Sequence, residues 1–117
     1  MAWQARLIER FGGAAGIRDT GLLEGALDRP RNQFSYEPDA ALERLAALYG
    51  VGLAKAHAFI DGNKRIAFAV MVAFMKAHGR TLDVTEAEAT AIMLGVASGA
   101  IDERALEQWL FGQKRRG

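Results

Sequence analysis

The sequence contains no cysteine, which excludes disulfide scaffolds, thiol nucleophiles and thiolate zinc sites together. Only two histidines, His57 and His78, are left to build a metal centre from nitrogen ligands, so we do not expect a structural zinc. Neither sign of charge dominates, because 15 Lys and Arg residues stand against 14 Asp and Glu residues. This balance does not support nonspecific binding to nucleic acid or to anionic membranes as the main activity, so any phosphate chemistry must come from a local site.

Long apolar runs are also absent. The longest one, residues 66–75, has ten residues, about half of what a membrane-spanning helix needs. Residues 1–10 contain neither a secretory apolar stretch nor a small-residue cleavage site, so we expect a cytoplasmic protein. With 117 residues, of which 50% are hydrophobic, the chain fits one domain (residues 1–117) with a single core.

Alternating stretches rich in β-branched residues are nearly absent, whereas apolar residues recur at helical spacing through most of the chain. We therefore expect an all-α domain, a compact bundle of about six helices. The third predicted helix is long, begins at residue 38 and carries an apolar stripe that extends to His57. The other predicted helices cover residues 3–11, about 20–28, 63–77, 86–97 and a last segment from 103. Because the helix at 63–77 is apolar all round, it is predicted to be the central helix around which the others pack.

Local signals set these boundaries. The predicted N-caps are Asp19, Thr85 and Asp102. Thr85 and Glu88 have the spacing of a capping box, and Pro30 is predicted to end the second helix. Residues 113–117 have the composition of a frayed basic tail.

The most informative segment is residues 57–65, His-Ala-Phe-Ile-Asp-Gly-Asn-Lys-Arg, a polar interruption between the two most apolar helices. The helix that begins near Asn63 has backbone N–H groups without intrahelical partners and a partial positive charge at its start, so it favours an anion. Gly62 lets the backbone approach a ligand closely, Lys64 supplies a point charge and Arg65 supplies a planar fork for phosphate oxygens. This combination favours a polyphosphate.

Two further side chains in the segment suit phosphoryl chemistry. Asp61 offers a hard oxygen ligand, and magnesium typically takes one or two protein carboxylates beside water and phosphate oxygens. His57 is a candidate general base, because imidazole titrates near neutral pH, and accepting a hydroxyl proton contributes about 10²–10⁴-fold in rate. A base, a metal ligand and a phosphate site therefore fall within nine residues.

Each of these residues also has a purely structural interpretation. His57 would serve as a hydrogen-bonded core histidine or as a favourable charge at a helix C-terminus. Asp61 or Asn63 would serve as an N-cap, and Phe59 as an anchor that packs the loop on the core. Their co-occurrence favours the functional interpretation, because a structural loop does not need a histidine, two cations and an asparagine as well.

The segment resembles the motif H-x-F-x-D-(A/G)-N-K-R of the Fic/Doc family, specifically of its Doc ("death on curing") toxin branch. The matching residues are His57, Phe59, Asp61, Gly62, Asn63, Lys64 and Arg65. The resemblance extends upstream through residues 12–30 and downstream to residues 95–99, and so covers nearly the whole chain.

The resemblance implies a small helical toxin of a toxin–antitoxin pair that uses ATP and Mg²⁺ to modify a hydroxyl side chain of a host protein. For Doc toxins this target is a threonine of translation elongation factor Tu, and its modification inhibits translation. It further implies that His57 is the general base, that Asp61 is the magnesium ligand, and that residues 62–65 (Gly62, Asn63, Lys64 and Arg65) form the phosphate site. The expected partner is a small Phd-like antitoxin that binds in a hydrophobic groove near the active site.

Two positions favour phosphoryl transfer over AMP transfer. In the wider Fic family, whose enzymes transfer AMP, a glycine occupies the position of Lys64, and a second motif arginine stands where this chain has Phe68. The lysine of Doc members is associated with a reversed nucleotide and with transfer of the γ-phosphoryl group. AMP transfer on the same fold and a catalytically silent, antitoxin-binding module remain as alternatives.

A second pattern concerns regulation. Residues 20–25 match the loose pattern S/T-x-x-x-E-G/N by which Fic enzymes are inhibited, with Glu24 as the inhibitory glutamate. The same residues also match the ordinary second helix of Doc proteins, so we favour coincidence.

Overall fold

Five helices account for most of the computed structural model, which describes residues 16–57, 62–113 and 115–116. The helices are α2 (Thr20–Tyr36), α3 (Leu42–Ala56), α4 (Asn63–Ala77), α5 (Glu86–Ser98) and α6 (Glu103–Phe111). The prediction of an all-α fold is confirmed. The helix expected at residues 3–11 lies outside the described residues.

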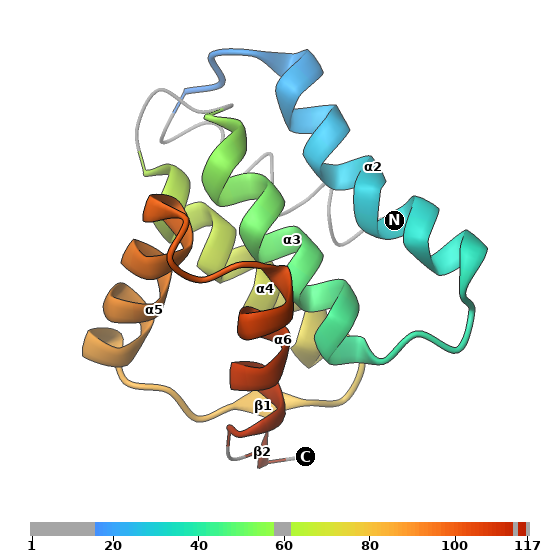
Figure 1. Ribbon diagram of the computed structural model, residues 1–117, viewed down its shortest axis with the longest axis vertical. Helices are drawn as coiled ribbons and strands as arrows, with labels where there is room; N and C mark the ends of the chain where they lie inside the picture. Colours follow the sequence, from blue (N-terminus) through green and yellow to red (C-terminus); the bar gives the residue numbers. More distant parts are fainter. Residues whose placement is uncertain (1–15, 58–61, 114, 117) are drawn as a thin grey trace.

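The central helix is α3, which packs against α2, α4, α5 and α6 (Figure 1). Between Leu45 and Ala54, α3 buries every residue except the half-buried Gly52. The prediction that the helix at 63–77 is central was therefore wrong. Apolar residues on every side of a helix predict that the helix is buried, but they do not predict how many other helices pack against it. In the described part of the chain, one side of α4 is only half-buried.

Small residues allow α3 to take neighbours on several sides. A Cβ atom built at Gly50 would lie 3.0 Å from the Leu106 side chain of α6 and 3.0 Å from Met71 Sδ of α4. A Cβ built at Gly52 would lie 3.6 Å from the carbonyl oxygen of Ala26 in α2. Two glycines on one helix thus bring three neighbouring helices close to its backbone.

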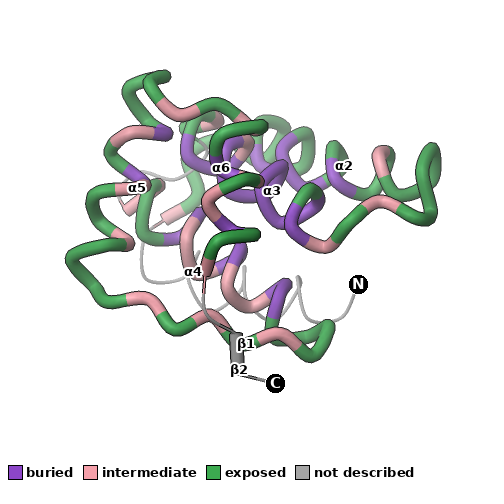
Figure 2. Tube along the Cα trace, turned by 60° about the horizontal axis from the view of Figure 1, so that its bottom comes forward, coloured by how far each residue is buried: buried purple, intermediate pink, exposed green. Residues whose placement is uncertain are grey.

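Helix α2 continues past Pro30 to Tyr36, so the prediction that Pro30 ends this helix was also wrong. Proline lacks the N–H group that would donate to the carbonyl of Ala26, and this loss destabilises a helix interior. Pro30 is nevertheless buried on the same face as Ala26 and Leu27. Packing of this face on α3 offsets the lost hydrogen bond, and the helix extends as an exposed projection (Figure 2).

The predicted helix caps are confirmed. The Asp19 side chain accepts from the N–H of Leu22, and Asp102 accepts from the N–H of Ala105 at 2.8 Å. Thr85 and Glu88 form the predicted capping box at the start of α5. These signals are read correctly because a cap depends on residues within one turn.

An ion pair with a buried carboxylate joins the beginning of α3 to the chain that follows α4. Glu43, only 2% exposed, accepts from Arg80 at 2.9 Å. Arg80 follows Gly79, whose φ of 83° ends α4 as a glycine after a helix commonly does. The pair therefore fixes the chain where it leaves α4.

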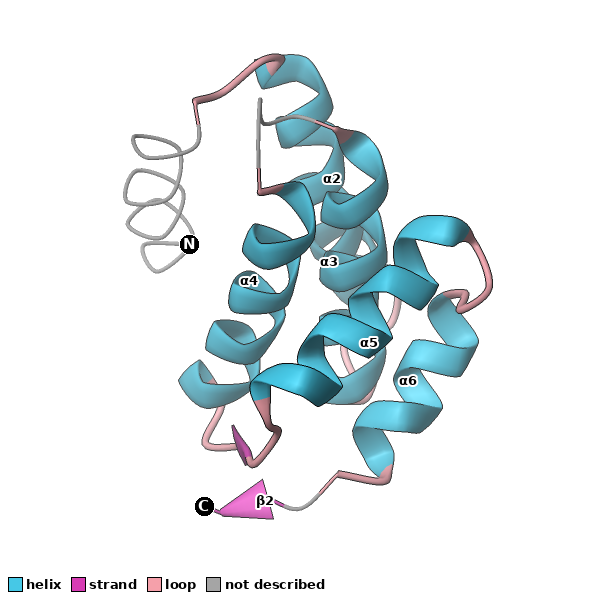
Figure 3. Ribbon diagram, turned by 90° about the vertical axis from the view of Figure 1, so that its left-hand side faces the viewer, coloured by secondary structure: helices cyan, strands magenta, loops and turns pink. Residues whose placement is uncertain are grey.

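The C-terminal residues correct another prediction. Arg115–Arg116 form strand β2, which pairs antiparallel with β1 (Thr81–Leu82) in the register Thr81 to Arg116 and Leu82 to Arg115 (Figure 3). This part of the expected frayed tail therefore has a backbone partner. A two-residue ladder uses main-chain groups that every residue has, so composition alone does not reveal it.

Candidate active site

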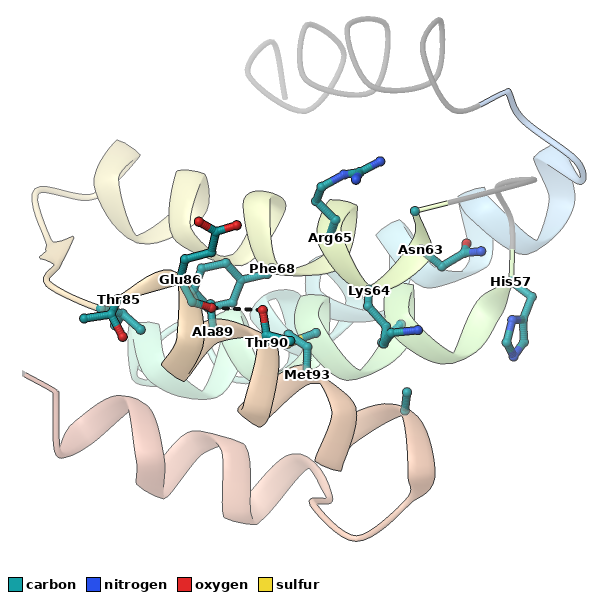
Figure 4. A pocket seen from close by; sticks show the side chains of 14 residues that line it. His57, Asn63, Lys64, Arg65, Phe68, Thr85, Glu86, Ala89, Thr90 and Met93 are labelled. Carbon is teal, nitrogen blue, oxygen red and sulfur yellow. Dashed lines mark hydrogen bonds between the residues drawn. The ribbon is translucent and has the colours of Figure 1, made fainter.

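One pocket of about 760 Å³ lies where the start of α4 faces α5 (Figure 4). Its lining comes from the end of α3, the first turns of α4, and the segment from Val84 through α5. The residues are Ala54, His57, Gly62, Asn63, Lys64, Arg65, Phe68, Val84, Thr85, Glu86, Ala89, Thr90, Met93 and Ala97. The five described residues of the predicted site therefore surround one cavity.

His57 stands directly after α3, as its C-cap, in the left-handed conformation with φ 52° and ψ 37°. The side chain is exposed, so the prediction that His57 extends the buried stripe of α3 was wrong. Among the described residues, His57 is the only non-glycine with positive φ. An L-residue pays about 1–2 kcal/mol for this conformation, which is characteristic of turns and of functional sites. The turn places the imidazole at the pocket instead of in the core.

The start of α4 is built to receive an anion. Its N-cap, Gly62, has φ 73° and supplies no side-chain hydrogen bond to the first turn. Lys64 and Arg65 are both exposed, and within the described ranges neither forms an ion pair. The positive end of the helix dipole and two cations therefore lie together at one end of the pocket.

Gly62 and Arg65 depend on each other. A Cβ atom built at Gly62 would lie 2.8 Å from Arg65 Nη2, closer than real Cβ contacts allow. Only glycine both adopts the left-handed turn without strain and leaves room for the guanidinium group across it. The guanidinium therefore lies close to the turn that begins α4.

The opposite wall of the pocket is not evident from the sequence. Helix α5 contributes Glu86, Ala89 and Met93 to it, and the hydroxyl group of Thr90 donates to the carbonyl of Glu86 at 2.9 Å. The capping box locates the start of this helix, but its packing against α4 is a contact between distant segments. A local pattern cannot supply that information.

Two predicted site residues, Phe59 and Asp61, lie outside the described residues. Within the part of the chain that the structure describes, no group of three His, Asp or Glu side chains could hold a metal ion. Glu24 is exposed on α2 and does not line the pocket. The described helices include none that is long and apolar enough to cross a bilayer.

Comparison with known proteins agrees with the motif. Residues 1–75 match the model of the Fic/DOC family. "Protein kinase doc" of Escherichia phage P1 is 32% identical over 94 residues, which cover 80% of this chain and 74% of the phage protein. "Toxin Doc" of Mycolicibacterium smegmatis is 39% identical over 83 residues, which cover 67% of this chain and 64% of that toxin. This chain therefore belongs to the Fic/DOC family and falls in its Doc toxin branch.

Proposed function

We propose that this chain is a toxin that transfers the γ-phosphoryl group of ATP to a threonine or serine hydroxyl of a host protein, with elongation factor Tu as the target. The observation that carries the proposal is the single pocket around His57, Asn63, Lys64 and Arg65. The name of the phage relative, a protein kinase, supports phosphoryl transfer, and the name of the second relative supports toxicity.

The phosphate groups are assigned to the start of α4. Backbone N–H groups of the first turn, the Lys64 ammonium and the Arg65 guanidinium are donors gathered at one end of the pocket, which matches the oxygens of a triphosphate. Asn63, at the first position of α4, lines the same pocket with a polar amide side chain. The Arg65 guanidinium lies beside Gly62, next to the first turn of α4, so both are able to bind the same phosphate.

His57 is assigned as the general base. The hydroxyl oxygen of the target attacks the γ-phosphorus, the bond from this phosphorus to the bridging oxygen breaks, and ADP leaves. The hydroxyl proton passes to the imidazole of His57, which faces the same pocket as Lys64 (Figure 4).

Magnesium is expected beside the nucleotide. Lys64, Arg65 and the start of α4 suit the phosphates that would bring the ion, and Asp61, which immediately precedes Gly62, would hold it. The bound ion would neutralise charge that develops on the phosphate oxygens.

The proposed partner in the cell is a small Phd-like antitoxin that binds in a hydrophobic groove and keeps the toxin inactive in the cytoplasm. Co-expression of the chain with the short reading frame adjacent to its gene tests this partner. We expect restored growth and a complex that survives gel filtration.

The reaction is tested by incubating the purified chain with ATP, Mg²⁺ and elongation factor Tu and measuring the intact mass of the factor. Addition of a phosphoryl group supports the proposal, whereas addition of an adenylyl group would establish AMP transfer instead. We expect His57→Ala to lower the rate at least about 100-fold. The matched control is His78→Ala, because His78 lies at the far end of α4, where its Nδ1 is 2.8 Å from the carbonyl oxygen of Phe74.

Toxicity in cells separates the silent binding module from an enzyme. If His57→Ala keeps full toxicity while the wild-type chain leaves elongation factor Tu unmodified, the catalytic proposal is wrong. Loss of toxicity in His57→Ala but not in His78→Ala supports it.

A further inference from the structure

We propose that Lys55 is a positioning residue for His57. Its ammonium group lies beside the C-terminal end of α5 and so holds the last turn of α3, which carries the imidazole, next to that helix. The inference rests on the proposed role of His57 as general base, but it concerns a residue outside both the motif and the pocket lining.

Lys55 occupies the last turn of α3, two residues before His57. Its side chain is exposed, and in the described parts of the chain it forms no ion pair. A Cβ atom built at Gly99 would lie 4.0 Å from Lys55 Nζ. Gly99 is the C-cap of α5, so the ammonium group of one helix lies beside the end of another.

The end of α5 offers this ammonium group a partner of opposite sign. Main-chain carbonyl groups at a helix C-terminus together carry about half a negative charge, which a nearby cation stabilises. The last turn of α5 contains no basic residue of its own, and residues 89–101 contain no charged side chain at all. Lys55 therefore supplies, from α3, the cation that the end of α5 lacks.

The turn that ends α5 is closed by two backbone hydrogen bonds. Gly99 has φ 87°, and its N–H donates to the carbonyl of Val96 at 3.1 Å. The N–H of Ile101 donates to the carbonyl of Gly95 at 3.0 Å. Because these N–H groups exchange with solvent only when the turn opens, their exchange rates report how firmly the end of α5 is held.

The two helix ends that Lys55 connects border the same pocket. His57, directly after α3, and Ala97, in the last turn of α5, both line it. Lys64 and Arg65 lie on α4 and do not depend on this connection. Removal of the Lys55 ammonium group should therefore displace the imidazole and leave the phosphate site in place.

Hydrogen exchange of the full chain tests the contact itself. Lys55→Met keeps the apolar stem and removes the ammonium group. We expect it to accelerate exchange of the Gly99 and Ile101 N–H groups about two- to fivefold, the size of a charge effect at a helix end. The matched control is Lys76→Met, because Lys76 is exposed in the last turn of α4, two residues before His78, and should leave both N–H groups unchanged. Unchanged exchange in Lys55→Met would overturn the proposal.

The NMR signals of the imidazole groups test the effect on His57. The chain has two histidines, so its spectrum has two Cε1–H signals, which His57→Ala and His78→Ala assign. Lys55→Met should shift the His57 signal and leave the His78 signal in place. Lys55→Arg, which keeps a cation at the end of the side chain, should return the signal toward its wild-type position. If the His57 signal stays in place in Lys55→Met, Lys55 does not position the imidazole.

Kinetics of phosphoryl transfer separate positioning from nucleotide binding. We expect Lys55→Met to lower kcat about tenfold, because displacement of a catalytic group by about 1 Å costs up to about 100-fold. KM for ATP should change less than about twofold. Lys55→Arg should recover most of the rate, and Lys76→Met should equal the wild-type chain. A rise in KM for ATP with kcat unchanged would show that Lys55 binds the nucleotide and would refute the positioning role.

The first two measurements do not require an active enzyme. If the wild-type chain transfers no phosphoryl group, the proposed function fails, and amide exchange and the imidazole signals alone decide whether Lys55 positions His57. If phosphoryl transfer occurs and Lys55→Met matches the wild-type chain in all three measurements, the inference fails and the proposed function stands. A thermal melt followed by circular dichroism establishes that each variant is folded.

Discussion

Substitution of Gly62 by alanine tests how the phosphate end of the pocket is built. The new methyl group meets two obstacles, the left-handed φ of 73° and Arg65 Nη2 at 2.8 Å. Two other glycines separate these contributions. Gly79 has φ 83° with nothing within 4 Å of a built Cβ, and Gly25 lies inside α2, also with open space.

The expected changes follow from these environments. Gly25→Ala should raise the free energy of unfolding by about 0.5–1 kcal/mol, because alanine is the better helix former. Gly79→Ala should lower it by about 1 kcal/mol, since an L-residue is disfavoured at positive φ. Gly62→Ala should also lower it by about 1 kcal/mol, because the exposed Arg65 side chain swings away from the new methyl group at little cost and the positive φ remains the main penalty. It should also weaken tripolyphosphate binding, which Gly25→Ala and Gly79→Ala should leave unchanged.

Urea denaturation followed by circular dichroism measures the three free energies, and the double variant Gly62→Ala with Arg65→Ala completes a cycle. The cycle is followed by tripolyphosphate affinity: once Arg65 is truncated, Gly62→Ala should weaken binding less than it does in the wild-type chain. If truncation of Arg65 leaves the effect of Gly62→Ala on tripolyphosphate affinity unchanged, the guanidinium does not lie beside Gly62 as described.

Three further predictions concern the fold. Gly50→Ala should lower the free energy of unfolding by about 1 kcal/mol or more, because a Cβ would lie 3.0 Å from atoms of α4 and α6. Gly52→Ala, where the Cβ contacts are 3.6 Å or longer, should be neutral or stabilising in the same urea titrations. Arg80→Ala should lower the free energy of unfolding by about 2–3 kcal/mol, because it removes a partner of the buried Glu43 carboxylate. Arg29→Ala, which breaks an exposed ion pair, should lower it by less than about 1 kcal/mol. Equal losses for the two variants would contradict the importance of burial. Asp102→Ala should lower the melting temperature through the loss of about 1 kcal/mol of N-cap stabilisation in α6, and an unchanged melting temperature would argue against this cap.

The features that the sequence predicts well are those decided within a few residues. The N-caps at Asp19 and Asp102, the capping box and the helix at 63–77 all depend on such local signals. The polar segment behaves in the same way, because His57 and residues 62–65 are close in the chain and line one pocket for that reason. Their catalytic roles stay predictions.

The features that the sequence predicts poorly depend on tertiary packing. Pro30 remains inside α2 because it lies on the buried face of a helix that packs on α3, and the residues next to it in the sequence do not reveal this packing. The choice of α3 over α4 as central helix depends on where the other helices pack. Glu86 joins the pocket for the same reason, since it is 21 residues after Arg65 in the chain.

The position of His57 immediately after α3 links the imidazole to the whole domain. Four helices pack on α3, so the orientation of its last turn is determined by contacts distributed through the interior and not by a separate surface loop. A form of the protein in which part of the interior is unfolded should therefore be inactive. Heat inactivation and loss of helical ellipticity should therefore coincide, and a proteolytic cut that releases α6 should abolish activity although α6 contributes no side chain to the pocket.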